Sequence, residues 1–212
     1  DMKQELKDLA GLKELDTIFF IADTEKQAAL FAGQIRTELG NRLDLLEKNA
    51  YRFCYINDFP MFEYNVEEKK IGFTHNPFSM PQGGLEALNE KDPLEILAYQ
   101  YDIVCNGVEL SSGAVRNHDM QIMEKAFEIA GYDKSVLEEK FGALYNAFQF
   151  GAPPHAGMAP GVDRMIMLLR NEENIREVIP FPMSGTAQDL MCGAPNEVTE
   201  QQLREVHIKV RQ

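Results

Sequence analysis

The sequence lacks the features that mark several large classes of protein. No apolar run within its 212 residues approaches the roughly 20 residues that a membrane-spanning helix needs. The first seven residues are charged and have a helical pattern, so we expect no signal peptide there. Internal repeats and low-complexity tracts are also missing. The sequence therefore predicts neither a membrane protein nor a repeat array.

Cysteine is scarce, and its spacing matches no common disulfide or metal-binding motif. Cys54, Cys105 and Cys192 lie far apart, are odd in number and form no C-x-x-C pair. This arrangement disfavours both a disulfide framework and a zinc site. We interpret each cysteine as a small apolar residue or an inert thiol, and we expect a reducing, cytoplasmic location.

Basic side chains are outnumbered by acidic ones, 21 to 34, which gives a formal net charge of −13 and a pI near 4.8. Binding of nucleic acid or an anionic membrane through overall charge is therefore excluded as a mode, although a local basic groove is compatible with this balance. With 44% apolar and 26% charged residues, the composition is that of a globular chain with one large domain or two small ones.

The first forty or so residues differ in pattern from the rest. The apolar residues 17–22 predict a buried strand, and a helix with its N-cap at Asp23-Thr24 is predicted to end near Gly40. Residues 41–49 are polar and indicate a boundary. We therefore expect residues 1–42 to be the end of a small α/β domain and residues 48–212 to form a second domain.

The second domain begins with β-like segments. Strands are predicted at residues 51–56, 71–74, 99–105 and 108–112, with a hairpin connection at 67–70 and a loop at 76–84. Pro60 is tolerable only at a strand edge, a strand start or a bulge. Asn106-Gly107 predicts a tight hairpin, because both residues accept positive φ.

Helices are predicted after these strands. They are expected near residues 93–97, at 119–130, at 134–148, and from a turn at Gly161 to residue 169. Strands that meet in antiparallel hairpins, with helices grouped afterwards, predict an α+β fold: an antiparallel β-sheet flanked by helices.

Asp102 and Glu109 are the first candidate site residues. On strands that flank the Asn106-Gly107 turn, alternation can bring both carboxylates to one sheet face. Two close carboxylates repel each other unless a positive group lies between them, and a divalent metal with phosphate oxygens would fill that role. The alternative is that both side chains are simply solvated.

Arg116 and His75 are two further candidates. Arg116 follows a small-residue stretch, and its guanidinium could grip a carboxylate in a bidentate way; the alternative is a structural ion pair. His75 stands where a strand meets a loop, and it could serve a site or be hydrogen-bonded locally. The same two interpretations apply to His118 and His155.

Residues 157–164 place two glycines around a turn that leads into an apolar helix. Glycine lets a ligand or a strand approach the backbone closely, and Arg164 could then stack on a flat ring or grip phosphate. The stretch is neither a Walker loop nor a G-x-G-x-x-G turn.

Five ordered segments carry a resemblance to a known family. Residues 151–164, Gly-Ala-Pro-Pro-His-Ala-Gly-Met-Ala-Pro-Gly-Val-Asp-Arg, resemble motif 3 of class II aminoacyl-tRNA synthetases in its aspartate-specific form. Four more match the bacterial-type aspartyl-tRNA synthetases: residues 58–62, 75–78, 106–116 and 174–182. Residues 1 to about 40 are similar to the end of the GAD domain that these enzymes insert between motifs 2 and 3.

The resemblance implies a role for each candidate. Arg164 would stack on the adenine of ATP, in a pocket shaped by Gly161, Val162 and Asp163. Glu109, with Asp102, would hold Mg²⁺ and the ATP phosphates. Arg116 would bind the side-chain carboxylate of L-aspartate, and His75 would lie over the amino acid. The expected catalytic residues are Glu109, Arg116 and Arg164.

The same resemblance implies an aspartate–tRNA ligase, with tRNA(Asn) open as a second acceptor beside tRNA(Asp), and a homodimeric parent enzyme. We find no match to the anticodon-binding domain, motif 1 or motif 2, so we expect the chain to be the C-terminal portion of such an enzyme. One alternative is a non-catalytic synthetase-like module that binds nucleotide, amino acid or a partner protein. Another is a tRNA-independent asparagine synthetase of the same fold, which the GAD-like segment disfavours.

Because motif 2 of the family supplies an arginine for the ATP α-phosphate, we predict that the purified chain by itself does not form aspartyl-adenylate. Aspartate-dependent ATP–pyrophosphate exchange should stay at the background rate measured without aspartate. An exchange rate well above that background would refute this expectation.

Overall fold

A four-stranded antiparallel β-sheet forms the centre of the larger of two units in this computed structural model, which describes residues 2–211. The units comprise residues 1–50 and 51–212. The strand order is β1-β4-β5-β6, and each pair of adjacent strands is antiparallel. Its strands are β1 (Phe53–Pro60), β4 (Leu97–Cys105), β5 (Val108–Val115) and β6 (Ala156–Pro160).

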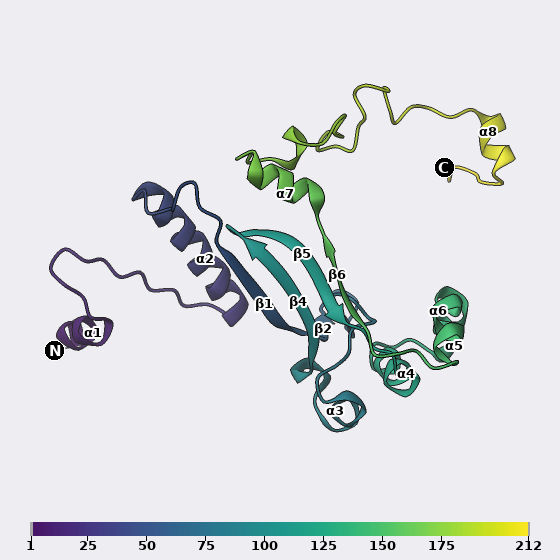
Figure 1. Ribbon diagram of the computed structural model, residues 1–212, viewed down its shortest axis with the longest axis horizontal. Coiled ribbons are helices and arrows are strands. Elements are labelled where there is room, and N and C mark those ends of the chain that lie inside the picture. The colour runs from purple at the N-terminus through teal and green to yellow at the C-terminus, as the bar shows by residue number, and fades with distance from the viewer. Residues whose placement is uncertain (1, 212) are drawn as a thin grey trace. The chain divides into compact units, whose positions relative to one another are not determined.

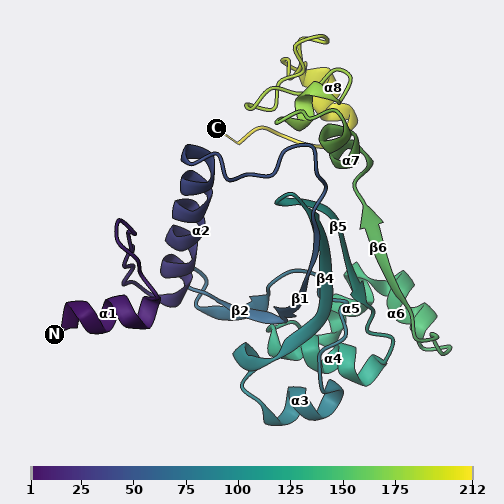
Figure 2. The same ribbon diagram turned by 60° about the vertical axis from the view of Figure 1, so that its left-hand side comes forward.

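Helices lie at both ends of this sheet. Figures 1 and 2 show α7 at one end and the helices α3 to α6 at the other. The arrangement confirms the predicted α+β class, an antiparallel sheet flanked by helices. The helices of this unit are α3 (Gly84–Glu90), η1 (Pro93–Glu95), α4 (Met120–Ile129), α5 (Lys134–Lys140), α6 (Gly142–Phe148), α7 (Val162–Leu169), η2 (Ile175–Glu177) and α8 (Glu200–Glu205).

The smaller unit contains α1 (Met2–Ala10) and α2 (Glu25–Arg42). The strand predicted at residues 17–22 is wrong: these residues have no regular structure, and Phe19 and Phe20 are exposed. A strand needs a partner for its backbone N–H and C=O groups, and the described residues of this unit form no other strand. No helix in the described part of the chain has the length and apolar content to cross a membrane.

The two-residue turn between β4 and β5 is the one that the sequence predicts. Asn106 and Gly107 have φ of 51° and 81°, which is the conformation of a tight hairpin whose twist matches the strands. Pro60 is also as expected, because it ends β1, an outer strand of the described sheet, just after a bulge between Asn57 and Phe59.

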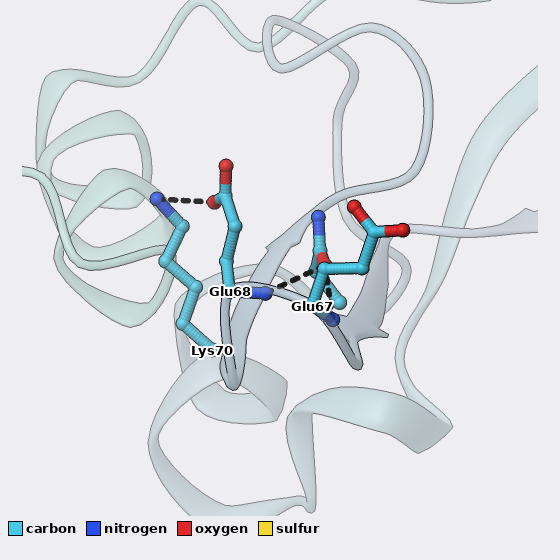
Figure 3. A network of polar contacts seen from close by, with 4 residues as sticks. Glu67, Glu68 and Lys70 are labelled. Carbon is cyan, nitrogen blue, oxygen red and sulfur yellow. Dashed lines mark hydrogen bonds and ion pairs between the residues drawn. The ribbon is translucent and has the colours of Figure 1, made fainter.

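A second hairpin, of strands β2 (Phe62–Asn65) and β3 (Lys70–Phe73), follows β1. Figure 3 shows its turn, in which Glu68 and Lys70 form an ion pair at 2.7 Å. The Asn65 side-chain oxygen accepts hydrogen bonds from the backbone N–H groups of Glu67 and Glu68, at 2.9 and 3.0 Å. The predicted solvated connection at residues 67–70 is therefore closed by local polar contacts.

Three details differ from the sequence prediction. The breaker-rich loop is followed by α3, which was not predicted, and residues 156–160 form strand β6, where a turn was expected. The helix predicted at 134–148 is two helices that meet at Phe141. The Phe141 ring packs edge-on against Phe78 at 5.0 Å, so a tertiary contact takes this residue out of the helical run.

Two clusters of buried side chains lie on the α3–α6 side of the unit. One joins the β2 region to α3 and α4, and the other joins α4 to α5 and α6. The first comprises Met61, Phe62, Leu88, Ile96, Ala98, Ala126 and Ala130; the second comprises Met123, Phe127, Leu137 and Tyr145, with Phe78 packed against it. Phe78 belongs to the loop after His75, so this core also holds that loop.

Strands β5 and β6 approach each other unusually closely at Gly113. A Cβ added there would lie 2.4 Å from the Gly157 carbonyl oxygen and 2.6 Å from Cε2 of Tyr101. The Tyr101 hydroxyl also donates to that Gly157 oxygen at 2.9 Å, so the ring is held in place.

We therefore predict that Gly113→Ala lowers the free energy of unfolding by about 2 kcal/mol, because backbone atoms must move to admit the methyl group. Urea denaturation of the purified chain measures this. Gly72→Ala is the matched control, since a Cβ at Gly72 in β3 would meet no atom within 4 Å. Equal stability of the two variants would contradict the close approach.

A polar cluster ties α4, α5 and α6 together. The buried Tyr145 hydroxyl donates to Glu124 Oε1 at 2.5 Å, and Lys134 Nζ lies 3.0 Å from the same oxygen. The Tyr145 hydrogen bond, with a contribution from Lys134, lowers the pKa of Glu124 below its ordinary value of 4.5, although partial burial opposes the shift.

Because the folded-state pKa of Glu124 is depressed, its ionised form stabilises the fold at neutral pH, and this contribution is lost as the pH falls through the folded-state pKa. We predict that Glu124→Gln lowers stability at pH 7 and that the difference from wild type shrinks toward pH 3. Thermal unfolding across this pH range tests it. A difference independent of pH would contradict the assignment. Glu90→Gln, at an exposed position of α3, is the control.

Candidate functional site

A cavity of about 430 Å³ lies against the sheet beside the loop that follows β3. Its ionisable lining residues come from four segments of the chain: His75 from the loop, Asp102 from β4, Glu109 from β5 and Arg116 from just beyond β5. The remaining lining residues are Phe59, Asn76, Gln100, Ser112, Gly113 and Ala159. Four of the eight predicted site residues therefore line one cavity.

The β4–β5 hairpin brings the two carboxylates to this cavity. Asp102 pairs with Ser112, and Glu109 pairs with Val104, across a register shift after Ile103. The extra residue in β5 is Leu110, which the shift leaves without a partner on β4. Asp102 is half-buried and Glu109 is exposed. The expectation that the tight turn places both carboxylates on one surface agrees with this geometry.

Arg164 contacts Glu109 in two ways. Its Nη1 donates to the Glu109 carbonyl oxygen at 2.7 Å and lies 3.2 Å from Glu109 Oε1. The backbone N–H of Gly161 donates to the Leu110 carbonyl oxygen at 2.7 Å, so the start of α7 is attached to β5. A guanidinium is thereby held beside one carboxylate of the cavity.

Val162 and Asp163 are less closely tied to the cavity. Both lie in the first turn of α7 with exposed side chains, and neither lines the cavity. They directly precede Arg164 along the chain, and their predicted role in an ATP pocket stays a prediction.

Arg116 is half-buried, and its backbone is held on two sides. Its N–H donates to the His155 carbonyl oxygen at 2.9 Å, and its backbone forms a β-bridge with Ser79. Among residues 2–211, no acidic side chain pairs with its guanidinium. The structural ion pair considered as the alternative for Arg116 is therefore not formed, and the cation is available to a ligand in the cavity.

His75 packs edge-on against the ring of Phe59, with 5.2 Å between ring centroids, and its side chain is exposed. Its ring makes no hydrogen bond to another described residue. The other two candidate histidines differ: Nδ1 of His155 lies 2.9 Å from the Pro153 carbonyl oxygen, and Nδ1 of His118 lies 3.5 Å from that of Arg116. Local hydrogen bonding, the alternative for all three, thus describes His155 best.

Sequence reasoning missed Gln100, which is 7% exposed in the cavity wall. Its amide Nε2 donates to Ser79 Oγ at 2.7 Å and to the Asn76 carbonyl oxygen at 3.3 Å. The available signal was a glutamine between two tyrosines in a strand. A polar residue in such a strand points either to solvent or to a buried hydrogen-bonded site, and the contacts of Gln100 depend on a loop that is remote in sequence.

Comparison with known proteins gives a consistent family. The family model of tRNA synthetases class II (D, K and N) matches residues 2–185. The "Aspartate--tRNA(Asp/Asn) ligase" of Zymomonas mobilis is 60% identical over 210 residues, which are 99% of this chain and 35% of that protein. The protein of the same name from Ehrlichia canis is 56% identical over 206 residues, 97% of this chain and 35% of its own length.

The chain therefore spans about a third of the length of the curated relatives that it matches. Among solved structures, an aspartyl tRNA synthetase from Entamoeba histolytica is 23% identical, with 89% of this chain and 31% of that chain covered and a TM-score of 0.49. The family model covers well over half of the residues. The chain belongs to the class II tRNA synthetases of the D, K and N family.

Proposed function

We propose that this chain forms part of an aspartate–tRNA ligase, which activates L-aspartate with ATP and transfers the aspartyl group to tRNA. The observation that carries the proposal is the guanidinium of Arg116, which has no acidic partner among the residues that the structure describes and lines the same cavity as His75, Asp102 and Glu109. Relatives named as ligases for tRNA(Asp/Asn) support it, and both tRNA(Asp) and tRNA(Asn) are proposed acceptors.

The amino-acid end of the cavity contains Arg116 and His75. A guanidinium offers two parallel N–H donors to a carboxylate, and this geometry selects the side chain of aspartate over its neutral amide. His75 lines the same cavity and can donate a ring N–H to the same carboxylate. Recognition of a negatively charged side chain follows from this pair.

The proposed nucleotide site adjoins the cavity at Glu109. It comprises Glu109, Arg164 and, at the start of α7 outside the cavity lining, Gly161, Val162 and Asp163. We infer that ATP lies here and that Arg164, now at 3.2 Å from Glu109 Oε1, stacks on its adenine or contacts its phosphates. The Gly161 N–H donates to the Leu110 carbonyl oxygen, so the start of α7 is attached to β5 next to Glu109.

Magnesium fits this donor set only together with a nucleotide. The described residues contain no group of three or more His, Cys, Asp or Glu side chains that could hold an ion. Asp102 and Glu109 offer two carboxylates, and Mg²⁺ is bound in such sites by one or two carboxylates with substrate phosphates. When bound there, it would neutralise phosphate charge.

The proposed reaction needs no nucleophile from the protein. The α-carboxylate oxygen of aspartate attacks the α-phosphorus of ATP, the bond to pyrophosphate breaks, and aspartyl-adenylate forms. A hydroxyl of the terminal tRNA ribose then takes the aspartyl group, and AMP leaves. Arg116 and His75 would orient the amino acid, and Arg164 would orient the nucleotide, so rate enhancement comes from position and charge.

The parent enzyme is proposed to be a cytoplasmic homodimer. The support for the compartment is chemical: Cys54, Cys105 and Cys192 are all free thiols, as in a reducing environment. Transfer RNA would be held by a local groove rather than by overall charge, because the chain has 13 more acidic than basic side chains.

The binding half of this proposal can be measured on the chain itself. We predict that it binds a non-hydrolysable aspartyl-adenylate analogue in calorimetry and that Arg116→Ala weakens this binding about a hundredfold, because a buried charge pair is lost. Arg170→Ala, at an exposed arginine beyond α7, is the control and should bind as wild type.

Three results would count against the proposal. A wild-type chain that binds no aspartyl-adenylate analogue is not part of a usable aspartate site. Equal affinity for the aspartyl and asparaginyl analogues would contradict the role assigned to Arg116. Binding of a partner protein or of nucleotide alone would favour a non-catalytic module.

A further inference from the structure

Gln100 is a buried polar side chain in the wall of the cavity. It lies in β4 between Tyr99 and Tyr101, and only 7% of its surface is exposed. A buried amide without hydrogen-bond partners costs free energy, so such groups are almost always paired. The partners of Gln100 lie on the loop that carries His75, and this location suggests a role for the side chain.

The Gln100 amide joins three segments. Its Nε2 donates to Ser79 Oγ at 2.7 Å and to the Asn76 carbonyl oxygen at 3.3 Å. Ser79 is fully buried, and its backbone is bridged to Arg116. One side chain from β4 therefore connects the loop next to His75 with the strand end that carries Arg116.

The second half of the loop has other attachments. The Met80 N–H donates to the Val115 carbonyl oxygen at 2.9 Å, and the Asn117 N–H donates to that of Phe78 at 2.7 Å. Residues 75–77 have fewer such ties. Within residues 2–211, Gln100 is the only side chain of the four-stranded sheet that donates a hydrogen bond to this part of the loop.

We propose that Gln100 is a positioning residue for recognition of the substrate's side-chain carboxylate. It holds the loop so that His75 and Arg116 reach one carboxylate at the same time, and it acts through them without binding the carboxylate itself. The inference rests on the proposed function and names a determinant of specificity for an acidic amino acid.

Two substitutions isolate this role. Gln100→Met keeps the length of the side chain and removes both hydrogen bonds. Ser79→Ala removes the shorter bond and leaves Gln100 in place, so it tests the link with a smaller change in the core. Gln121→Met, at an exposed glutamine on α4, is the matched control.

The readout is the ratio of affinities for two ligands in calorimetry: a non-hydrolysable aspartyl-adenylate analogue and the alanyl-adenylate analogue, which lacks the side-chain carboxylate. We expect Gln100→Met and Ser79→Ala to weaken the aspartyl analogue about tenfold, the effect of one lost hydrogen bond, and the alanyl analogue less than twofold. Gln121→Met should change neither affinity.

Equal weakening of both analogues, or no weakening in either variant, would overturn the inference, because a merely structural role does not distinguish the two ligands. If Gln100→Met does not fold, Ser79→Ala alone decides. If the wild-type chain binds neither analogue, both the proposed function and this inference are wrong. If the wild-type chain binds the aspartyl analogue and the variants bind it with the same affinity, only the inference is wrong.

Discussion

The register between β4 and β5 is the constraint on which the rest of the cavity depends. The left-handed conformations of Asn106 and Gly107 permit a two-residue turn, and the turn sets which residues face each other along both strands. A slip of one residue would exchange the two faces of β5 and move Glu109 out of the cavity. The extra residue at Leu110 is part of the same arrangement, because it adjusts the alternation between Glu109 and Ser112.

Charged groups of both signs meet at the cavity. Two carboxylates, Asp102 and Glu109, and the Arg116 guanidinium line it, and the Arg164 guanidinium contacts Glu109 from outside the lining. Arg164 already has a partner in Glu109, and Arg116 has none among residues 2–211. Arg116 is therefore the cationic lining residue beside which an anionic ligand group gains most.

Local signals predicted much of this fold and of the candidate site. The Asn106-Gly107 hairpin and α7 each depend on residues within one short stretch, and both were predicted correctly. Pro60 lies on an outer strand after a bulge, which is compatible with the placements that the sequence left open. The four ionisable cavity residues were also chosen from sequence, since their residue types and positions beside turns indicate chemistry. The residues themselves do not show that they share one cavity, because they span positions 75 to 116. Only the family resemblance predicted a common site, and the β-sheet is what places the residues together.

The features that escaped prediction depend on distant partners. Residues 17–22 are apolar like a strand but have no described strand to pair with, whereas residues 156–160 are small and unlike a strand but pair with β5. Phe141 lies between two helices, where its ring packs edge-on against the ring of Phe78.

The loop after His75 shows how such distant partners can serve a site. It is rich in proline and glycine, so its own sequence gives it little regular structure, and its conformation is set from outside. Phe78 is packed into the helical core, Met80 is bonded to the end of β5, and Gln100 reaches Asn76 from β4. Residues 75–77 therefore form a short segment between strand β3 and the attached residues Phe78 and Met80. A substitution in them can alter what the cavity recognises while the core that holds them stays unchanged, which is the arrangement expected where specificity is set on a rigid scaffold.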